Sequence, residues 1–170
     1  LNNSIKPTIV TFNTIIDAYV RAKDLTSAWK IFEDLLKNDI QPDNFTLSTL
    51  FRGIRCPNHK DYLLRGLELV NQFNNTSSDN NHSNFNQTAD IILINVLLDS
   101  CIALKESTLI IELFNNVTEG RIKKVKPDLI TYNTFIKGCA QMNLFNEVLI
   151  AFEKMCNDPN IKPNDVTFNT

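Results

Sequence analysis

The chain has 170 residues, of which 43% are hydrophobic and 21% are charged, and its formal net charge at pH 7 is −2. This apolar content is sufficient for an ordered domain, whereas the charge gives no strong field that would attract nucleic acid or an anionic membrane. No apolar run approaches the roughly 18 residues of a membrane span, and residues 1–7 resemble no secretion or transit signal.

A four-residue phrase centred on asparagine or serine recurs along the chain. Its copies are Thr11-Phe12-Asn13-Thr14, Thr46-Leu47-Ser48-Thr49, Leu93-Ile94-Asn95-Val96, Thr131-Tyr132-Asn133-Thr134 and Thr167-Phe168-Asn169-Thr170. The first residues of successive copies are 35, 47, 38 and 36 positions apart. A period near 35 is typical of stacked helical hairpins. The sequence therefore predicts an all-α solenoid whose function lies along an extended inner surface.

Residues 9–43 show one hairpin most clearly. The first helix is predicted from apolar residues at helical spacing, which are Phe12, Ile15, Ile16, Tyr19 and Val20. The second helix carries a similar face, made of Ala28, Ile31, Phe32, Leu35 and Leu36. We expect Asp24 or Thr26 to cap its start and Pro42 to end the unit, because proline lacks a backbone donor.

The same register predicts the organisation of the whole chain. We expect residues 1–8 to be the tail of a preceding repeat, 9–43 the first repeat, 44–90 the second, 91–128 the third, 129–164 the fourth and 165–170 the start of a truncated repeat. The second repeat has an Asn/Ser-rich insertion at about 74–88, which we interpret as a mobile loop, with a partner-binding loop as the alternative. We also expect the chain to be a piece of a longer protein.

The residue types needed for catalysis or for a metal site are present but dispersed. The four cysteines are Cys56, Cys101, Cys139 and Cys156. They form no Cys-x-x-Cys pair, and we interpret them as buried free thiols. The acidic residues are spread out by the repeat rather than clustered around an open metal site, and no phosphate-binding glycine loop or Ser/His/Asp set occurs. We therefore expect this chain to have no catalytic residues, no metal site and no cofactor.

The first and fourth repeats carry the clearest family resemblance. The run from Val10 to Tyr19, closed by Gln41-Pro42-Asp43, resembles the pentatricopeptide repeat, and so does the run from Lys126 to Ile136. The Trp-Leu-Gly-Tyr pattern of the tetratricopeptide repeat is absent, since the only tryptophan, Trp29, lies in the second predicted helix. The resemblance implies a right-handed superhelix of helix-turn-helix repeats that binds single-stranded RNA, one base per repeat.

The resemblance also assigns roles to residues. In the family the fifth and last residues of a repeat select the base, and the second residue flanks it. The implied base-selecting residues are Asn13 with Asp43, Ser48 with Asp90, Asn95 with Asp128, Asn133 with Asn164, and Asn169. The implied flanking residues are Val10, Phe45, Ile92, Ile130 and Val166. These pairs imply a preference for 5′-U-G-U-C-3′. The structural alternative is that an Asn or Ser near a helix start only caps the helix or bonds the backbone.

Phosphate-binding positions are less complete than the base-selecting ones. The family commonly has lysine near position 13 of a repeat, where this chain has Arg21, Cys56, Ala103 and Gln141. Arg21 is therefore the implied phosphate residue, and four neighbouring side chains could substitute elsewhere: Arg52, Arg55, Lys105 and Lys137. So few basic residues imply a shallow dependence of RNA binding on salt.

Three functions remain open. The first is RNA binding in organellar RNA processing, stability or translation, with a mitochondrion or plastid as the compartment by family analogy. The second is a scaffold that binds protein subunits of a ribosome-like assembly, which the isoelectric point of 5.7 favours. The third is the RNA-binding arm of an enzyme, such as a protein-only ribonuclease P or an organellar RNA polymerase, whose catalytic domain lies outside this chain.

Overall fold

The structure is a computed structural model, and it describes residues 6–75, 89–122 and 124–168. Within these residues, helix is the only regular secondary structure. The elements are α1 (Ile9–Arg21), α2 (Leu25–Lys37), α3 (Asn44–Arg52), the short 3₁₀ helix η1 (Pro57–His59), α4 (Lys60–Asn75), α5 (Ile91–Ala103), α6 (Ser107–Thr118), α7 (Leu129–Gln141), α8 (Phe145–Asn157) and α9 (Asp165–Phe168).

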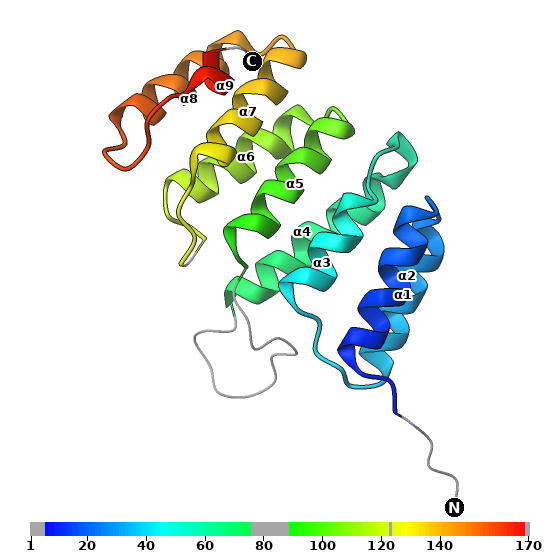
Figure 1. Cartoon of the computed structure of the whole chain (residues 1–170). Helices are drawn as coiled ribbons and strands as arrows, with labels where there is room; N and C mark the ends of the chain where they lie inside the picture. Colours follow the sequence, from blue (N-terminus) through cyan, green and yellow to red (C-terminus); the bar gives the residue numbers. More distant parts are fainter. Residues whose placement is uncertain (1–5, 76–88, 123, 169–170) are drawn as a thin grey trace, which may run out of the picture.

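The helices form two layers, as Figure 1 shows. The first layer consists of α1, α3, α5, α7 and α9, each of which contacts the next. The second layer consists of α2, α4, α6 and α8, each of which contacts the first-layer helix that precedes it in the chain. This serial stacking confirms the predicted all-α solenoid. It also places the starts of all the first-layer helices along one side of the molecule.

The first-layer helices begin at residues 9, 44, 91, 129 and 165, the positions at which the sequence analysis begins its repeats. The starts of α3, α5 and α7 follow from the residue before each helix. Asp43, Asp90 and Asp128 each accept a hydrogen bond from the backbone N–H three residues on, at 2.7, 2.8 and 2.8 Å. Such caps satisfy a helix-terminal donor that would otherwise lack a partner. The division into repeats itself stays a prediction.

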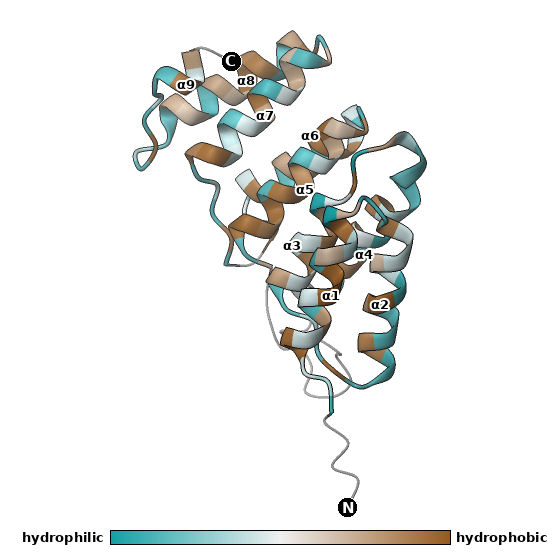
Figure 2. Cartoon of the chain, turned by 45° about the vertical axis from the view of Figure 1, so that its right-hand side comes forward, coloured by the Kyte–Doolittle hydropathy of each residue, from teal (hydrophilic) through white to brown (hydrophobic). Residues whose placement is uncertain are grey.

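A continuous apolar core fills the space between the two layers. Equivalent positions of the four second-layer helices contribute to it: Phe32, Val70 and Phe114 are buried, and Phe152 is half-buried. Phe114 stacks on Phe135 of α7, with ring centroids 3.8 Å apart. Not all hydrophobic residues belong to this core. Figure 2 shows hydrophobic residues at the starts of α5 and α7 as well. The core therefore leaves some large apolar side chains uncovered on the first layer.

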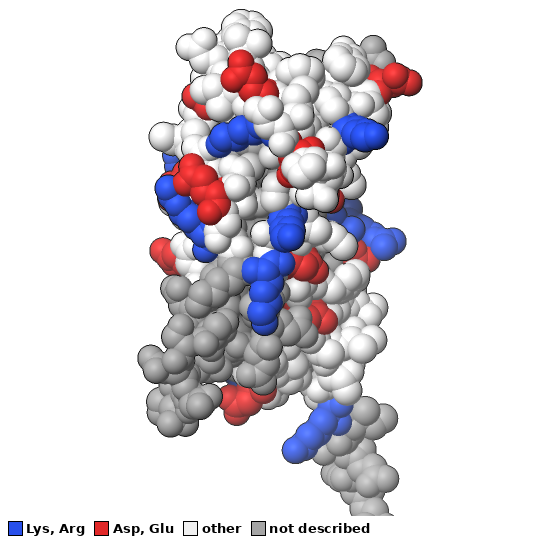
Figure 3. Space-filling model, turned by 90° about the vertical axis from the view of Figure 1, so that its left-hand side faces the viewer, with Lys and Arg blue, Asp and Glu red and all other residues white. Residues whose placement is uncertain are grey.

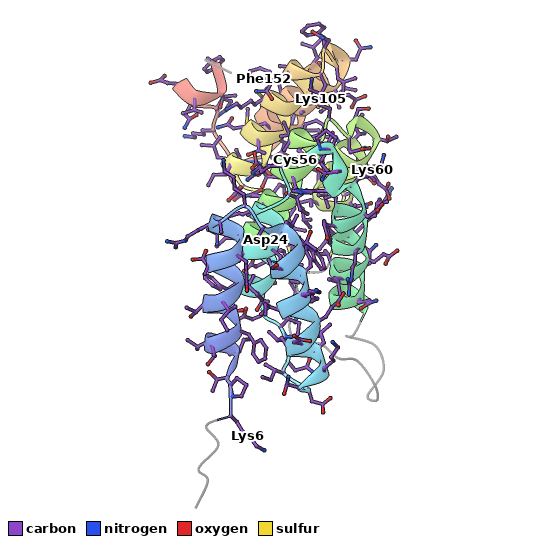
Figure 4. All side chains as sticks on the ribbon, turned by 90° about the vertical axis from the view of Figure 1, so that its right-hand side faces the viewer. Lys6, Asp24, Cys56, Lys60, Lys105 and Phe152 are labelled. Atoms are coloured by element: carbon purple, nitrogen blue, oxygen red, sulfur yellow. The ribbon has the colours of Figure 1, made fainter. Side chains whose placement is uncertain are left out.

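Short turns connect the helices within a pair. Lys23, Lys105 and Asn143 adopt positive φ angles of 61°, 58° and 59° in the turns after α1, α5 and α7. Of the two predicted caps for α2, Asp24 is the one used, because it accepts a bond from Ser27 N at 3.0 Å. In Figure 4, Asp24, Cys56 and Lys105 follow one another along the edge formed by these turns.

The second helix pair departs from this pattern on both sides of α4. Residues 53–59, which include η1, replace the short turn between α3 and α4. Helix α4 continues to Asn75, two residues into the predicted insertion. The rest of that insertion, residues 76–88, lies outside the described residues, so its predicted mobility stays a prediction.

The prediction of four buried thiols is wrong for two of them. Cys101 and Cys139 are fully buried, whereas Cys56 and Cys156 are exposed. Cys56 lies in the extended link before η1, outside any helix packed on the core. Cys156 follows the buried Met155 in the last turn of α8, so it points about 100° away from the core-facing side.

Candidate nucleic-acid interface

Five large apolar side chains stand exposed at the starts of the first-layer helices. We call them the apolar ladder: Val10, Phe45, Ile92, Ile130 and Val166, each 55–69% exposed. Each is the second residue of its helix. An aligned set of exposed apolar residues commonly marks a binding surface. These are also the residues that the family resemblance assigns to base flanking.

One open hollow of about 330 Å³ lies between α3 and α5. Two ladder residues, Phe45 and Ile92, line it, together with the predicted base-selecting pair of Ser48 and Asp90. The guanidinium-bearing Arg52 completes its wall. The structure therefore brings together apolar, polar and basic side chains around a space within the usual range of ligand sites, about 300–1,000 Å³.

A second hollow of about 700 Å³ lies between α7 and α9 and combines the same kinds of side chain, with Asp165 as its acidic member. The ladder residues Ile130 and Val166 line it, with the predicted pair Asn133 and Asn164. Lys137 contributes the positive charge. Two sites far apart in the sequence thus repeat one arrangement, because each is built from the same positions of neighbouring first-layer helices.

The two Asn–Asp pairs are also brought together. Asn13 Nδ2 donates to Asp43 Oδ1 at 3.5 Å, and Asn95 Nδ2 donates to Asp128 Oδ1 at 3.2 Å. Asn13 is only 8% exposed, because it lies at the floor between α1 and α3. It is buried among polar groups rather than in the apolar core, so its amide is satisfied by hydrogen bonds.

We call each predicted base-selecting pair, together with the side chains bonded to it, a cluster, numbered in chain order. The sequence analysis did not identify the threonine residues that belong to three of these clusters. The hydroxyls of Thr46, Thr131 and Thr167 lie 2.7, 2.8 and 2.8 Å from Oδ1 of Asn13, Asn95 and Asn133, respectively. Their signal in the sequence is the threonine that opens the recurring phrase at residues 46, 131 and 167.

The second predicted pair lacks this connection. Among the described residues no hydrogen bond joins Ser48 to Asp90, although both line the same hollow. Leu93 stands where the other clusters have threonine, and it is fully buried. Asn169, the predicted selector of the truncated repeat, lies outside the described residues.

The basic residues near the first layer differ in their partners. Arg21 forms an ion pair with Asp17 at 2.7 Å, although its side chain remains 80% exposed. Arg55 pairs with Asp99 at 2.8 Å. Arg52 and Lys137 line the hollows. On the face shown in Figure 3, positive and negative side chains are interspersed rather than gathered by sign.

The chemistry of the site is that of recognition by amides, carboxylates and apolar surfaces. Burial raises the pKa of the Cys101 and Cys139 thiols to about 12, so neither is an effective nucleophile at neutral pH. Within the part of the chain that the structure describes, no group of three or more His, Cys, Asp or Glu side chains is placed to hold a metal ion. No described helix combines the length and apolarity of a membrane span.

Comparison with known protein families gives matches over most of the chain. Residues 7–55 and 127–170 match the PPR repeat family, and residues 81–142 match the pentatricopeptide repeat domain. A chloroplastic pentatricopeptide repeat-containing protein of Arabidopsis thaliana is 25% identical over 166 residues, which cover 96% of this chain and 19% of that protein. A mitochondrial one from the same plant is 28% identical over 170 residues, covering 94% and 15%. The chain thus spans about a fifth or less of the length of these relatives.

Solved structures show the same fold. The crystal structure of the pentatricopeptide repeat protein PPR10 from maize matches with a TM-score of 0.74 and 17% identity, over 96% of this chain and 21% of that one. The structure of PPR10 in complex with an 18-nt psaJ RNA element matches with a TM-score of 0.66 and 18% identity, over 97% and 22%. These likenesses confirm the predicted right-handed superhelix of helix-turn-helix repeats.

Proposed function

Because the chain belongs to the pentatricopeptide repeat family, we propose that it binds single-stranded RNA along its first helix layer. One base enters between each two neighbouring first-layer helices. The observation that carries this proposal is the pair of hollows, each bordered by two ladder residues with a polar pair between them. The fold similarity to a maize protein solved with an RNA element supports it.

The mechanism is recognition without chemistry. A base stacks between two apolar ladder residues. Binding is favourable because the base removes the exposed apolar surface of these side chains from water. The polar pair at the floor then hydrogen-bonds the Watson–Crick edge of the base. A mismatched base leaves buried polar groups unpaired, at a cost of about 1–3 kcal/mol.

The base-selecting pairs set the proposed sequence preference, 5′-U-G-U-C-3′. Asn13 with Asp43 and Asn95 with Asp128 take uracil. Ser48 with Asp90 takes guanine, and Asn133 with Asn164 takes cytosine. For the backbone we propose that Arg21, Arg52 and Lys137 contact phosphates, since Arg21 stays exposed beside Asp17 and the other two line the hollows.

The proposed setting is organellar RNA processing, stability or translation. The relatives named above are chloroplastic and mitochondrial proteins, which supports a plastid or a mitochondrion. We propose no catalytic role for this chain, since its described side chains suit binding.

The test is selection of bound RNA from a random pool, followed by affinity measurements with one ladder variant and one matched control. Ile130→Asp places a charge where a base would stack, so we expect at least a tenfold loss of affinity for the selected RNA, equivalent to about 1.4 kcal/mol. Leu149→Asp is the control, because Leu149 is 63% exposed and Ile130 is 62% exposed, but Leu149 lies on α8 in the second layer. No enriched motif, or equal losses in both variants, would contradict the proposal.

A protein scaffold is the second candidate function. Phe145, Leu149 and Ile150 on α8 are exposed apolar residues outside the first layer, and such patches suit protein partners. If no RNA motif is enriched and a purified protein partner binds the wild type but not Leu149→Asp, the scaffold function is favoured instead.

A further inference from the structure

Three buried threonine hydroxyls occupy the same place in the first, third and fourth clusters. The backbone N–H of the preceding cap residue donates to each hydroxyl: Asp43 N to Thr46 at 3.3 Å, Asp128 N to Thr131 at 3.1 Å and Asn164 N to Thr167 at 3.1 Å. A hydroxyl has one proton to donate. Since a backbone donor approaches each hydroxyl oxygen, the proton points away from that donor, toward two acceptors. These are Oδ1 of the asparagine of the preceding first-layer helix, at 2.7, 2.8 and 2.8 Å, and Oδ1 of the cap residue, at 2.7, 2.8 and 3.2 Å.

The cap carboxylate and this hydroxyl together fix the orientation of the asparagine amide, because the carboxylate accepts from Nδ2 and the amide oxygen that faces the hydroxyl can only accept its proton. Asn13 Oδ1 accepts from Thr46, at 2.7 Å, and Asn13 Nδ2 faces the Asp43 carboxylate. The reversed amide would place its oxygen against a carboxylate oxygen and its NH₂ group against the hydroxyl proton. Asn95, Asp128 and Thr131 repeat the arrangement.

The oriented amide presents one hydrogen-bond donor, next to a carboxylate acceptor, to the groove that runs between the first-layer helices. One of the two amide hydrogens of Asn13 is directed to Asp43, which leaves the other for a ligand. The second carboxylate oxygen of Asp43, Oδ2, takes part in none of these bonds. A donor beside an acceptor complements uracil, whose edge has a carbonyl oxygen next to N3–H. Cytosine has a lone pair at N3, which the carboxylate would repel.

The fourth cluster supplies the opposite polarity. Asn164 replaces the aspartate, and its Oδ1 accepts from the backbone N–H of Thr167 at 3.2 Å, whereas the hydroxyl of Thr167 lies nearer to Asn133 Oδ1, at 2.8 Å, than to Asn164 Oδ1, at 3.2 Å. Its amide nitrogen is then the group left to face a base, and a donor there suits the N3 lone pair of cytosine. The second cluster has no hydroxyl at this place, since Leu93 occupies it.

We propose that Thr46 and Thr131 are positioning residues that orient Asn13 and Asn95, and so make these two sites prefer uracil over cytosine. This inference rests on the proposed RNA binding. It extends the site from two selecting residues to three, and the third comes from the following helix. The selectivity of one site thereby depends on the correct stacking of the next repeat.

The test compares RNAs that differ only by U or C at the first base, and a second pair that differ only at the third base. Thr46→Val removes the hydroxyl and keeps the side-chain shape. We expect the wild type to prefer U by roughly fivefold to tenfold at each base. In Thr46→Val the preference at the first base should fall to within about twofold, with the third base unchanged, and Thr131→Val should give the reverse result.

Two further variants separate orientation from stability. Thr46→Ser keeps the hydroxyl and should keep the preference. Thr49→Val changes an equally buried threonine of α3 whose hydroxyl accepts from Arg52, and it should leave the first-base preference intact. Thermal unfolding is measured for every variant, and if Thr46→Val does not fold, Thr131→Val decides the question at the third base.

A threonine-to-valine variant that melts earlier but keeps its U/C preference would overturn the inference, because the threonine would then only help to cap its helix. Wild-type protein that binds the selected RNA without a U/C preference would also overturn it. Failure of the wild type to bind any RNA would instead overturn the proposed function itself.

Discussion

Asn13 illustrates how a single residue that stabilises the fold is also suited to the recognition role that we propose for it. Its amide is nearly buried, and its bonds to Asp43 and Thr46 connect α1 to the start of α3. A buried amide without partners would cost about 1–3 kcal/mol, so these bonds are needed whether or not RNA is present. The interpretation of such residues as structural and their interpretation as base-selecting are therefore compatible, because the bonds use only part of the hydrogen-bonding capacity of the amide.

The four cysteines allow a direct test, residue by residue, of which side chains are buried. With a pKa of about 12, the thiols of Cys101 and Cys139 have about one thiolate in ten thousand at pH 8. We expect a thiol reagent at pH 8 to modify Cys56 and Cys156 quickly in the folded protein, and the other two only after unfolding. Counting modified thiols by mass spectrometry, with and without denaturant, checks this. Cys56→Ser and Cys156→Ser should each remove one fast-reacting thiol, and four fast thiols in the native protein would contradict the packing.

At the scale of elements, α4 packs on α3 through a glycine. A Cβ on Gly66 would lie 2.5 Å from Cε1 of the Phe51 ring, and Phe51 is fully buried. Helix propensity alone would favour alanine over glycine by about 1 kcal/mol, but a ring enclosed by the core cannot move aside without strain of about 1–3 kcal/mol. We therefore expect Gly66→Ala to lower the free energy of unfolding, measured by urea denaturation.

The control for Gly66→Ala is a double-mutant cycle with Phe51→Leu, which removes the ring. If overlap with the ring is the cause, adding Gly66→Ala to Phe51→Leu should cost less than adding it to the wild type, with a coupling of about 1 kcal/mol. Equal costs in both backgrounds would show that α3 and α4 pack differently from this description.

The helices could be predicted from the sequence because local chemistry sets them. Apolar spacing of the 3.6-residue period predicts α1 and α2. The Pro-Asp pairs at residues 42–43 and 127–128 are local signals of the same kind, since their aspartates cap α3 and α7. The contacts between repeats could not be predicted in this way. The bond from Thr46 to Asn13 joins residues 33 positions apart, and its geometry depends on how α3 packs on α1.

The partners of charged side chains also could not be predicted from the sequence, because they depend on how the repeats pack. Arg55 and Asp99 meet only because α3 and α5 are neighbours, so the sequence identified Arg55 as a free candidate for phosphate binding that the structure shows in an ion pair. The exposure of Cys56 likewise depends on the link before η1, which the repeat register does not describe. Positions within one helix followed from the sequence, whereas the partners of their side chains required the stacked structure.

At the scale of the whole molecule, the interspersed charges imply that RNA binding depends weakly on salt. Alternate first-layer helices differ at their ninth residue, which is Asp17, Arg52, Asp99 and Lys137 in α1, α3, α5 and α7. The acidic members are engaged by Arg21 and Arg55, and the basic members line the two hollows. The groove therefore offers positive charge mainly at alternate sites rather than as a continuous track.

Salt titration of RNA affinity measures this directly. Each phosphate contact to a single strand adds about −0.7 to the slope of log affinity against log salt, so Arg21, Arg52 and Lys137 together should give about −2. Replacing Arg52 or Lys137 by glutamine should make the slope shallower by about 0.7 and weaken binding to all sequences alike, since phosphate contacts carry no base information. Arg21→Gln should act in the same way if Arg21 reaches the backbone from its ion pair with Asp17. Lys37→Gln is the control, because Lys37 lies on α2 in the second layer and pairs with Asp34. A slope that Arg52→Gln and Lys137→Gln leave unchanged, or that Lys37→Gln changes equally, would place the RNA backbone away from these hollows.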